Sequence, residues 1–160
     1  MAIILASASP RRQELLRQVG CDFSVVISDI VEDNNQNLSP QELVMLQAKE
    51  KAIDVASKVS KNDVVIGADT IVVFNGKVYG KPEDLADARR ILTSLSGNEH
   101  QVITGIAVAL AGRIWTDFVI TTVKFSAVTS EEIEKYLETG EPMDKAGAYG
   151  IQGVGALMVE

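Results

Sequence analysis

The chain has 160 residues, a formal net charge of -7 and 46% hydrophobic residues. This length suits one compact domain and is too short for two ordinary ones. The negative charge argues against a nucleic-acid binder or an anionic-membrane binder, because such proteins carry a basic face. No apolar run reaches the roughly 20 residues that cross a bilayer. The sequence therefore predicts one soluble domain that binds neither nucleic acid nor membrane.

The amino-terminal segment is apolar, but no basic residue precedes it, which disfavours a secretory signal peptide. The single cysteine, Cys21, cannot form an internal disulfide. This agrees with a reducing compartment. We therefore expect a cytoplasmic protein in which Cys21 is buried as a small hydrophobic residue.

A short Ile-rich segment at residues 2–6 predicts a buried strand. Ser9 and Pro10 follow it, and they suit the cap and the first position of a helix that ends at Gly20. The apolar face that we expect for this helix consists of Leu15, Leu16 and Val19. The chain thus begins as strand, tight loop and helix.

An acidic, amide-rich segment at residues 29–37 follows a second short strand, which we expect at residues 23–27. The segment has no regular period and predicts a surface loop, a kind of element that often carries function. Ser39 and Glu42 then form a capping-box pattern, which predicts a helix that continues to about Lys58.

The second half of the chain alternates strands and helices. Residues 64–68 predict a buried strand, and the Asn75-Gly76 pair predicts a tight hairpin turn after it. The remaining expected elements are strands at 71–74 and 77–79, a helix at 83–95, a hairpin of strands 101–110 and 114–125 around Gly112-Arg113, a capped helix from Thr129 to Gly140, and a last strand at 156–159. This order predicts an α/β layered domain with a mixed, twisted sheet flanked by helices.

The start of the first helix is a candidate anion site. A helix start presents unpaired backbone N–H groups and a partial positive charge. Ser7, Ser9, Arg11 and Arg12 add hydroxyl and guanidinium donors around it, and the two arginines point about 100° apart, so they can grip opposite sides of a polyphosphate. The alternative interpretation is a capped helix with two solvated arginines.

Asp69 directly follows the predicted strand at residues 64–68, at an edge where α/β sheets often present their ligands. It is a candidate general base or metal ligand, and the alternative is an aspartate that caps a turn. Glu32, in the acidic loop, is a candidate second oxygen ligand for Mg²⁺ or Mn²⁺. Lys51 and Lys81 can neutralise phosphate charge, although exposed lysines are usually only solvated.

Other common sites are excluded. The single histidine, His100, leaves no partner for a histidine-rich metal site and no visible triad, so we expect a structural role for it. Neither GxxxxGK[ST] nor GxGxxG occurs in the sequence, which removes the two common glycine-rich phosphate-binding loops.

Five ordered segments together resemble the Maf family of nucleotide pyrophosphatases. They are SASPRRQELL at residues 7–16, GADTIV at 67–72, YGKP at 79–82, LSGNEHQVITG at 95–105 and GEPMDKAGAYGIQG at 140–153. The resemblance covers essentially the whole chain. It implies a fold like that of the Maf and inosine triphosphate pyrophosphatases, and one such domain over residues 1–160. Family members continue past the last predicted strand into a Gly-Leu-Pro-containing segment with a further helix, which this domain is expected to lack.

The resemblance also implies an activity. It implies a cytoplasmic, usually homodimeric hydrolase that uses Mg²⁺ or Mn²⁺ and splits a nucleoside triphosphate into the monophosphate and pyrophosphate. Asp69 is then the proton acceptor, and Glu32 assists catalysis or binds the metal together with Asp69. The residues that would hold phosphates are Ser7, Ser9, Arg11, Arg12, Lys51 and Lys81, of which Lys81 also counts as catalytic.

Three positions bear on the choice of base. With Arg12, Thr70 and Gln152, the chain resembles the family branch that acts on dTTP and UTP. The amide of Gln152 can both donate to and accept from the edge of a pyrimidine ring. Two alternatives stay open: a 7-methyl-GTP pyrophosphatase of the same family, and a non-catalytic nucleotide-binding regulator of septum formation.

Overall fold

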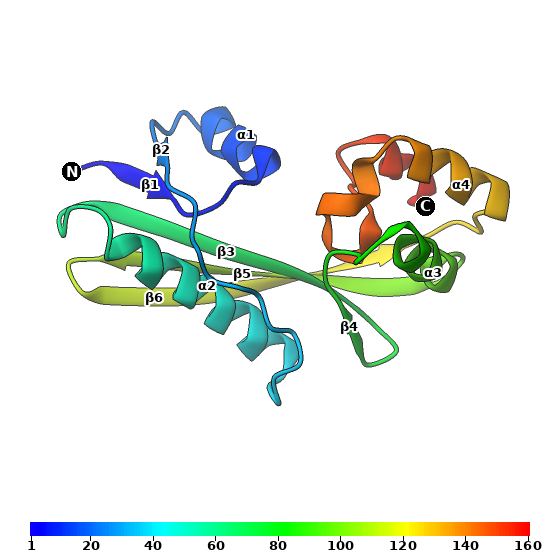
Figure 1. Cartoon of the computed structure of the whole chain (residues 1–160), viewed down its shortest axis with the longest axis horizontal. Helices are drawn as coiled ribbons and strands as arrows, with labels where there is room; N and C mark the ends of the chain where they lie inside the picture. The colour runs from blue at the N-terminus through cyan, green and yellow to red at the C-terminus, as the bar shows by residue number, and fades with distance from the viewer. The chain divides into compact units, whose positions relative to one another are not determined.

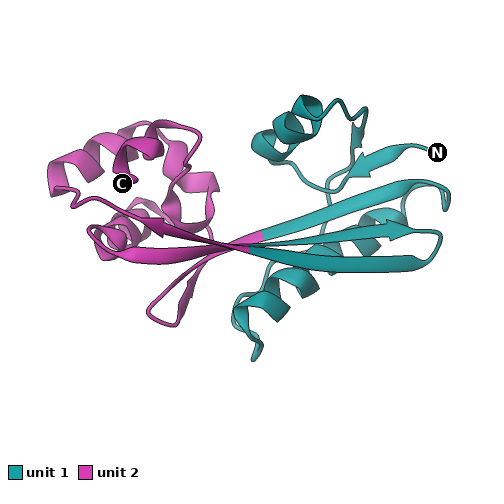
Figure 2. Ribbon diagram, turned by 180° about the vertical axis from the view of Figure 1, so that it is seen from behind, with its two compact units in different colours: residues 1–69, 104–119 teal, residues 70–103, 120–160 magenta.

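The computed structural model describes all residues, 1–160, as two compact units. Unit 1 contains residues 1–69 and 104–119, and unit 2 contains residues 70–103 and 120–160 (Figure 2). One six-stranded sheet and four α-helices make up most of the chain (Figure 1). The predicted fold class, an α/β mixed sheet with flanking helices, is confirmed. The prediction of one domain stays a prediction.

The sheet has the strand order β2-β1-β3-β5-β6, and β4 pairs with β3 outside this path. β1 runs parallel to both β2 and β3, whereas β3 and β4 are antiparallel, so the sheet is mixed as predicted. The strands are β1 (Ile3–Leu5), β2 (Ser24–Val25), β3 (Val64–Phe74), β4 (Lys77–Tyr79), β5 (Glu99–Leu110) and β6 (Arg113–Lys124).

Every α-helix begins at a side-chain cap that accepts a hydrogen bond from the first turn. Ser39 and Thr129 form the two capping boxes that the sequence predicts. The helices are α1 (Pro10–Gln18), α2 (Pro40–Ala56), α3 (Leu85–Leu95) and α4 (Ser130–Glu138), and their caps are Ser9, Ser39, Asp84 and Thr129. No helix combines the length and the apolar character that crossing a membrane would require.

Two hairpin turns use consecutive residues with positive φ, as tight two-residue turns prefer. Asn75 (φ 49°) and Gly76 (φ 74°) form the first, which confirms the prediction. Ala111 (φ 51°) and Gly112 (φ 79°) form the second, one residue earlier than the predicted Gly112-Arg113 turn. The earlier turn leaves Arg113 as the first residue of β6.

Strand β3 corrects the prediction that a strand ends at residue 68 and another begins at residue 71. β3 pairs with β1 through residues 64–66 and with β4 through residues 72–74, so the backbone between these contacts stays extended. Asp69 therefore lies in the middle of an 11-residue strand and does not follow the end of one.

The predicted strand at residues 156–159 is also wrong, because most of it belongs to the 3₁₀ helix η3 (Val154–Met158). The carboxylate of Glu141 accepts hydrogen bonds from the backbone N–H groups of Val154 (3.1 Å) and Gly155 (3.0 Å). These bonds satisfy N–H groups at the start of a helical turn. Only Val159 keeps a strand-like bridge, to Phe125.

Two predictions of burial near the amino terminus are wrong. Helix α1 contains no buried residue, and Leu15 is 45% exposed. Leu15 and Leu16 are the only large apolar residues among its nine, which is too few to drive a helix into a core. Cys21, just beyond this helix, is partly exposed instead of buried.

The core of unit 1 forms where α2 lies against the sheet, beside β3 and β5 (Figures 1 and 2). Two glycines make this contact close. A Cβ at Gly67 would lie 2.3 Å from the carbonyl oxygen of Ala48, and a Cβ at Gly105 would lie 2.4 Å from the carbonyl group of Val44. Since real Cβ atoms do not approach backbone this closely, only glycine permits the observed spacing.

The core of unit 2 contains α3, α4 and a group of aromatic rings. His100 is buried there, with Nε2 2.6 Å from the hydroxyl of Tyr149 and its ring edge-on to Phe125. Burial lowers the pKa of His100 from 6.5 to about 4. A neutral imidazole packed among rings agrees with the structural role expected from the sequence.

Replacing Gly105 by Ala is expected to lower the free energy of unfolding by at least about 2 kcal/mol, because the added methyl group meets backbone of α2. Urea unfolding monitored by circular dichroism measures this. Gly20→Ala is the control, since no atom lies within 4 Å of the added group and only left-handed backbone strain of about 1 kcal/mol applies. Equal losses in the two variants would contradict the close contact.

His100 makes stability depend on pH. Because its folded-state pKa lies below the unfolded value, its contribution is complete above about pH 6.5 and is lost as pH falls toward 4. Between pH 7 and pH 4 the free energy of unfolding of the wild type should fall by about 3 kcal/mol more than that of His100→Gln. The carboxylates titrate in both proteins, so their effect cancels in this comparison. A titration of the single histidine by NMR checks the assignment, and a midpoint near 6.5 would refute it.

Candidate functional site

Five predicted site residues come together in unit 1. They are Ser7, Arg12, Glu32, Lys51 and Asp69, from the loop after β1, helix α1, the acidic loop, helix α2 and strand β3. The hydrogen bonds and ion pairs among them define the acid–base cluster.

Arg12, in the first turn of α1, contacts the loop after β1 and strand β3. Ser9 caps α1 by accepting from the backbone N–H of Arg12 (3.4 Å). The guanidinium of Arg12 donates from Nη1 to Ser7 Oγ (3.0 Å) and to the carbonyl oxygen of Ala68 (3.1 Å). Burial lowers the pKa of Arg12, while the carboxylates of Asp69 and Glu32 oppose this shift. Arg11, the residue before Arg12 in the helix, makes no hydrogen bond or ion pair and is only partly exposed.

Lys51 lies between the two acidic residues. Its Nζ atom is 2.7 Å from Glu32 Oε1 and 3.2 Å from Asp69 Oδ1, and it also donates to the carbonyl oxygen of Ala68 at 3.4 Å. The Lys51 side chain is only 11% exposed. An ammonium group has three protons to donate, and these three acceptors match them.

Asp69 is the most buried charged group of the cluster, with a side chain 3% exposed. Oδ1 accepts from Lys51, whereas Oδ2 is buried and has no hydrogen-bond partner. Burial raises the pKa of Asp69; Lys51 and Arg12 oppose the rise and Glu32 adds to it. An unpaired buried oxygen on a carboxylate with a raised pKa is an acceptor held ready for a proton or a cation.

The acidic loop is fastened to α2 by residues that the sequence analysis missed. Buried Gln47 accepts at Oε1 from the backbone N–H of Asp33 (3.2 Å) and donates from Nε2 to Asn34 Oδ1 (2.8 Å). Asp54 accepts from the backbone N–H of Asp29 at 2.9 Å. Gln47, Lys51 and Asp54 share one face of the helix because they are four and three residues apart. A polar residue one turn before Lys51, on the same face of the helix, is the signal that could have found Gln47.

Three further predicted residues belong to unit 2. Thr70 follows Asp69 directly in β3 and is partly exposed. Lys81 follows β4, and Gln152 lies in the turn before η3. The side chains of Lys81 and Gln152 are exposed and make no hydrogen bond, so both are available to a ligand.

The cluster fits a divalent cation that draws most of its ligands from elsewhere. No group of three or more His, Cys, Asp or Glu side chains is arranged to hold a metal. Mg²⁺, however, commonly binds through one or two carboxylates together with substrate phosphates and water. Glu32 and Asp69 provide two carboxylates that both contact Lys51 Nζ, and Asp69 Oδ2 has no hydrogen-bond partner.

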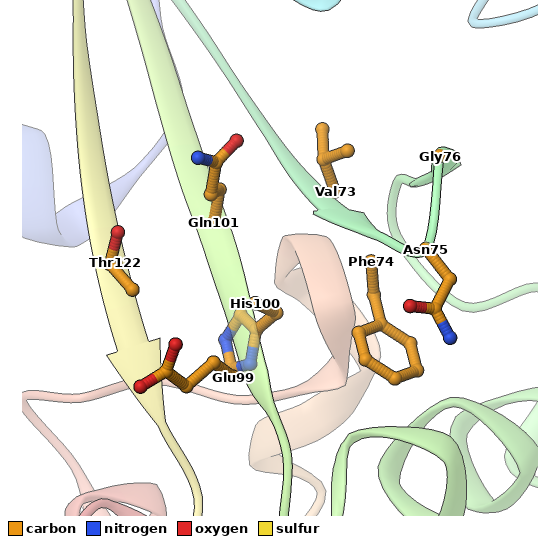
Figure 3. A pocket seen from close by; sticks show the side chains of 8 residues that line it. All are labelled: Val73, Phe74, Asn75, Gly76, Glu99, His100, Gln101 and Thr122. Carbon is orange, nitrogen blue, oxygen red and sulfur yellow. The ribbon is translucent and has the colours of Figure 1, made fainter.

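A separate pocket of about 350 Å³ lies in unit 2 and contains none of the predicted site residues (Figure 3). It is lined by Val73, Phe74, Asn75, Gly76, Glu99, His100, Gln101 and Thr122. The side chains of Glu99 and Gln101 are exposed, so this pocket opens to solvent beside the β3–β4 turn.

The fold and the cluster define an α/β protein with two acidic and two basic side chains gathered around one central strand. The chain belongs to the Maf family, since the model for Maf-like proteins matches residues 2–160. A dTTP/UTP pyrophosphatase of Clostridium botulinum is 52% identical and aligns with 99% of this chain and 84% of its own length. Proteins of the same name from Clostridium novyi and Alkaliphilus metalliredigens are 51% and 50% identical, over 85% and 83% of their lengths.

Among solved structures, the Ham1 protein of Staphylococcus aureus aligns with 78% of this chain and 72% of its own, at 15% identity and a TM-score of 0.49. The family recognised in the sequence is confirmed by the family model and the curated relatives.

Asp69→Asn is expected to raise the free energy of unfolding at pH 7. Because the folded-state pKa of Asp69 lies above its unfolded value near 3.9, its favourable contribution is complete only below that value and is lost as pH rises through the folded-state pKa. At pH 7 the buried carboxylate therefore costs stability that asparagine does not. Thermal unfolding at pH 7 and pH 4 measures the effect, which should shrink at pH 4. The exposed Asp117→Asn is the control, and a destabilised Asp69→Asn would contradict the argument.

Proposed function

We propose that this chain hydrolyses nucleoside triphosphates to the monophosphate and pyrophosphate, with dTTP and UTP as its preferred substrates. One observation supports this most directly: buried Asp69 offers an unpaired oxygen within a cluster that also contains Arg12 and Lys51. The relatives named dTTP/UTP pyrophosphatase, about half identical over nearly the whole chain, support the same reaction.

In the proposed reaction, water attacks the α-phosphorus and the bond to the oxygen that bridges the α and β phosphates breaks. Asp69 accepts the proton of the attacking water, and pyrophosphate leaves with the bridging oxygen. A carboxylate whose pKa is raised by burial is a better proton acceptor than an exposed one. Asp69 lies on a strand that is paired at both ends, so the backbone of this base is fixed in position.

The cations hold the charge of the substrate. Phosphoryl transfer depends mostly on positioning and on stabilising negative charge. In this proposal Arg12 and Lys51 bind phosphates within the cluster, and Lys81 is a further phosphate-binding residue that also counts as catalytic. Ser7, Ser9, Arg11 and the N–H groups at the start of α1 complete the phosphate-binding set.

Glu32 and Asp69 would hold Mg²⁺ or Mn²⁺, with the phosphates and water as its other ligands. When bound, such an ion neutralises phosphate charge and polarises the phosphoryl group. Glu32 keeps its place because Gln47 and Asp54 fasten the loop on either side of it.

Base choice is assigned to Arg12, Thr70 and Gln152. The exposed amide of Gln152 can pair with the edge of a uracil or thymine ring. The relatives at about half identity are named dTTP/UTP pyrophosphatase. Both observations favour the pyrimidine triphosphates over the alternative substrate, 7-methyl-GTP.

The proposal includes a homodimer that works in the cytoplasm. β6 is an edge strand of the sheet, and it exposes Trp115 (52%), Phe118 (38%) and Val119 (66%) in unit 1. Exposed apolar side chains on an edge strand are unusual in a monomer and suit contact with a second copy.

The test is the identity of the products. Incubation with dTTP or UTP and Mg²⁺ should release pyrophosphate and the monophosphate, and chromatography of the nucleotide with an enzymatic pyrophosphate assay measures both. Asp69→Asn should lower kcat by at least about 100-fold, because a general base contributes roughly that much. The exposed Asp22→Asn, outside the cluster and outside β6, should match the wild type. Release of the diphosphate with single phosphate would refute the reaction, and tight binding of dTTP without turnover at any Mg²⁺ concentration would favour a non-catalytic regulator.

A further inference from the structure

Lys51 occupies the place between the carboxylates of Glu32 and Asp69. Its Nζ atom reaches an oxygen of each at 2.7 and 3.2 Å. A cation that binds both carboxylates at once must come close to this same point. The Lys51 side chain is 11% exposed and that of Asp69 3% exposed, so little water is available to screen two cations from each other.

The charges of the cluster already balance without any ligand. Glu32 and Asp69 carry two negative charges, and Lys51 and Arg12 carry two positive charges. A divalent cation alone would leave an uncompensated double charge in a mostly buried place, which is unfavourable. A triphosphate brings the negative charge that restores the balance, and it gives the ammonium group of Lys51 new acceptors.

We propose that Lys51 exchanges partners during binding: it pairs with Glu32 and Asp69 in the free protein and passes to the substrate phosphates when a metal-bound triphosphate enters. The metal ion and the nucleotide then bind together, and neither occupies the cluster tightly alone. Asp69 Oδ2 is buried and has no partner in the free protein, so a cation can bind it without breaking an existing hydrogen bond. This inference rests on the proposed function in one respect: it takes a nucleoside triphosphate as the ligand.

Mn²⁺ binding in the absence of turnover tests the exchange. Electron paramagnetic resonance measures free Mn²⁺ with and without a dUTP analogue whose α–β bridging oxygen is replaced by a methylene group. The wild type should bind Mn²⁺ at least tenfold more tightly with the analogue than without it. Lys51→Met should bind Mn²⁺ without the analogue at least tenfold more tightly than the wild type, because its two carboxylates have lost their internal cation. Added Mn²⁺ should also raise the Tm of this variant more than that of the wild type.

Lys58 offers a matched control. Its Nζ atom also joins two carboxylates, those of Asp29 and Asp54, on the same helix, but at an exposed place. Lys58→Met should leave the Mn²⁺ affinity unchanged. Lys51→Arg keeps a cation between Glu32 and Asp69, so it should not gain affinity for Mn²⁺ in the absence of the analogue.

Two results would overturn the exchange: an analogue that binds the wild type without changing its affinity for Mn²⁺, or an affinity of Lys51→Met for Mn²⁺ equal to that of the wild type. If Lys51→Met does not fold, the wild-type comparison and Lys51→Arg still decide. Failure of the proposed function is seen separately, as an analogue that does not bind the wild type at all while Lys51→Met still gains Mn²⁺ affinity.

Discussion

The close approach of α2 to the sheet is the constraint on which the candidate site depends. Gly67 of β3 and Gly105 of β5 leave no room for a side chain beneath the helix, so its backbone lies directly on the strands. At this spacing a side chain on the rim of the helix reaches the strand beside it. Lys51 of the helix can therefore contact Asp69 of the strand.

The same helix organises the acidic part of the site. One face carries apolar residues into the core of unit 1, and the neighbouring polar face presents Gln47, Lys51 and Asp54 to the loop that contains Glu32. Hydrogen bonds to backbone N–H groups at Asp29 and Asp33 hold the loop before and after Glu32. A loop without regular structure thereby acquires a defined position, which a charged residue needs if it is to act together with a buried aspartate.

Local sequence signals predicted most of the elements, and their failures have local physical causes. Caps at Ser39 and Thr129 and the Asn75-Gly76 turn are encoded within a few residues, so they were recognised. The continuity of β3 depends on pairing with β1 and β4, which no short segment reveals. The helical turn that takes up residues 156–158 begins at Val154 and Gly155, whose N–H groups donate to Glu141, a residue outside that segment. The cluster residues were predicted by type and resemblance, but their contacts, and the part played by Gln47, depend on tertiary structure.

Asp69 lies within a long strand that pairs with β1 before this residue and with β4 after it. The residues of the site therefore differ in how far they can move. The backbone beneath the aspartate cannot shift without breaking the sheet, whereas Lys51 is a flexible chain and Glu32 is carried by a loop. A protein built in this way can adjust to the charge of what it binds through the lysine and the loop, while the aspartate at the centre of the sheet keeps its place.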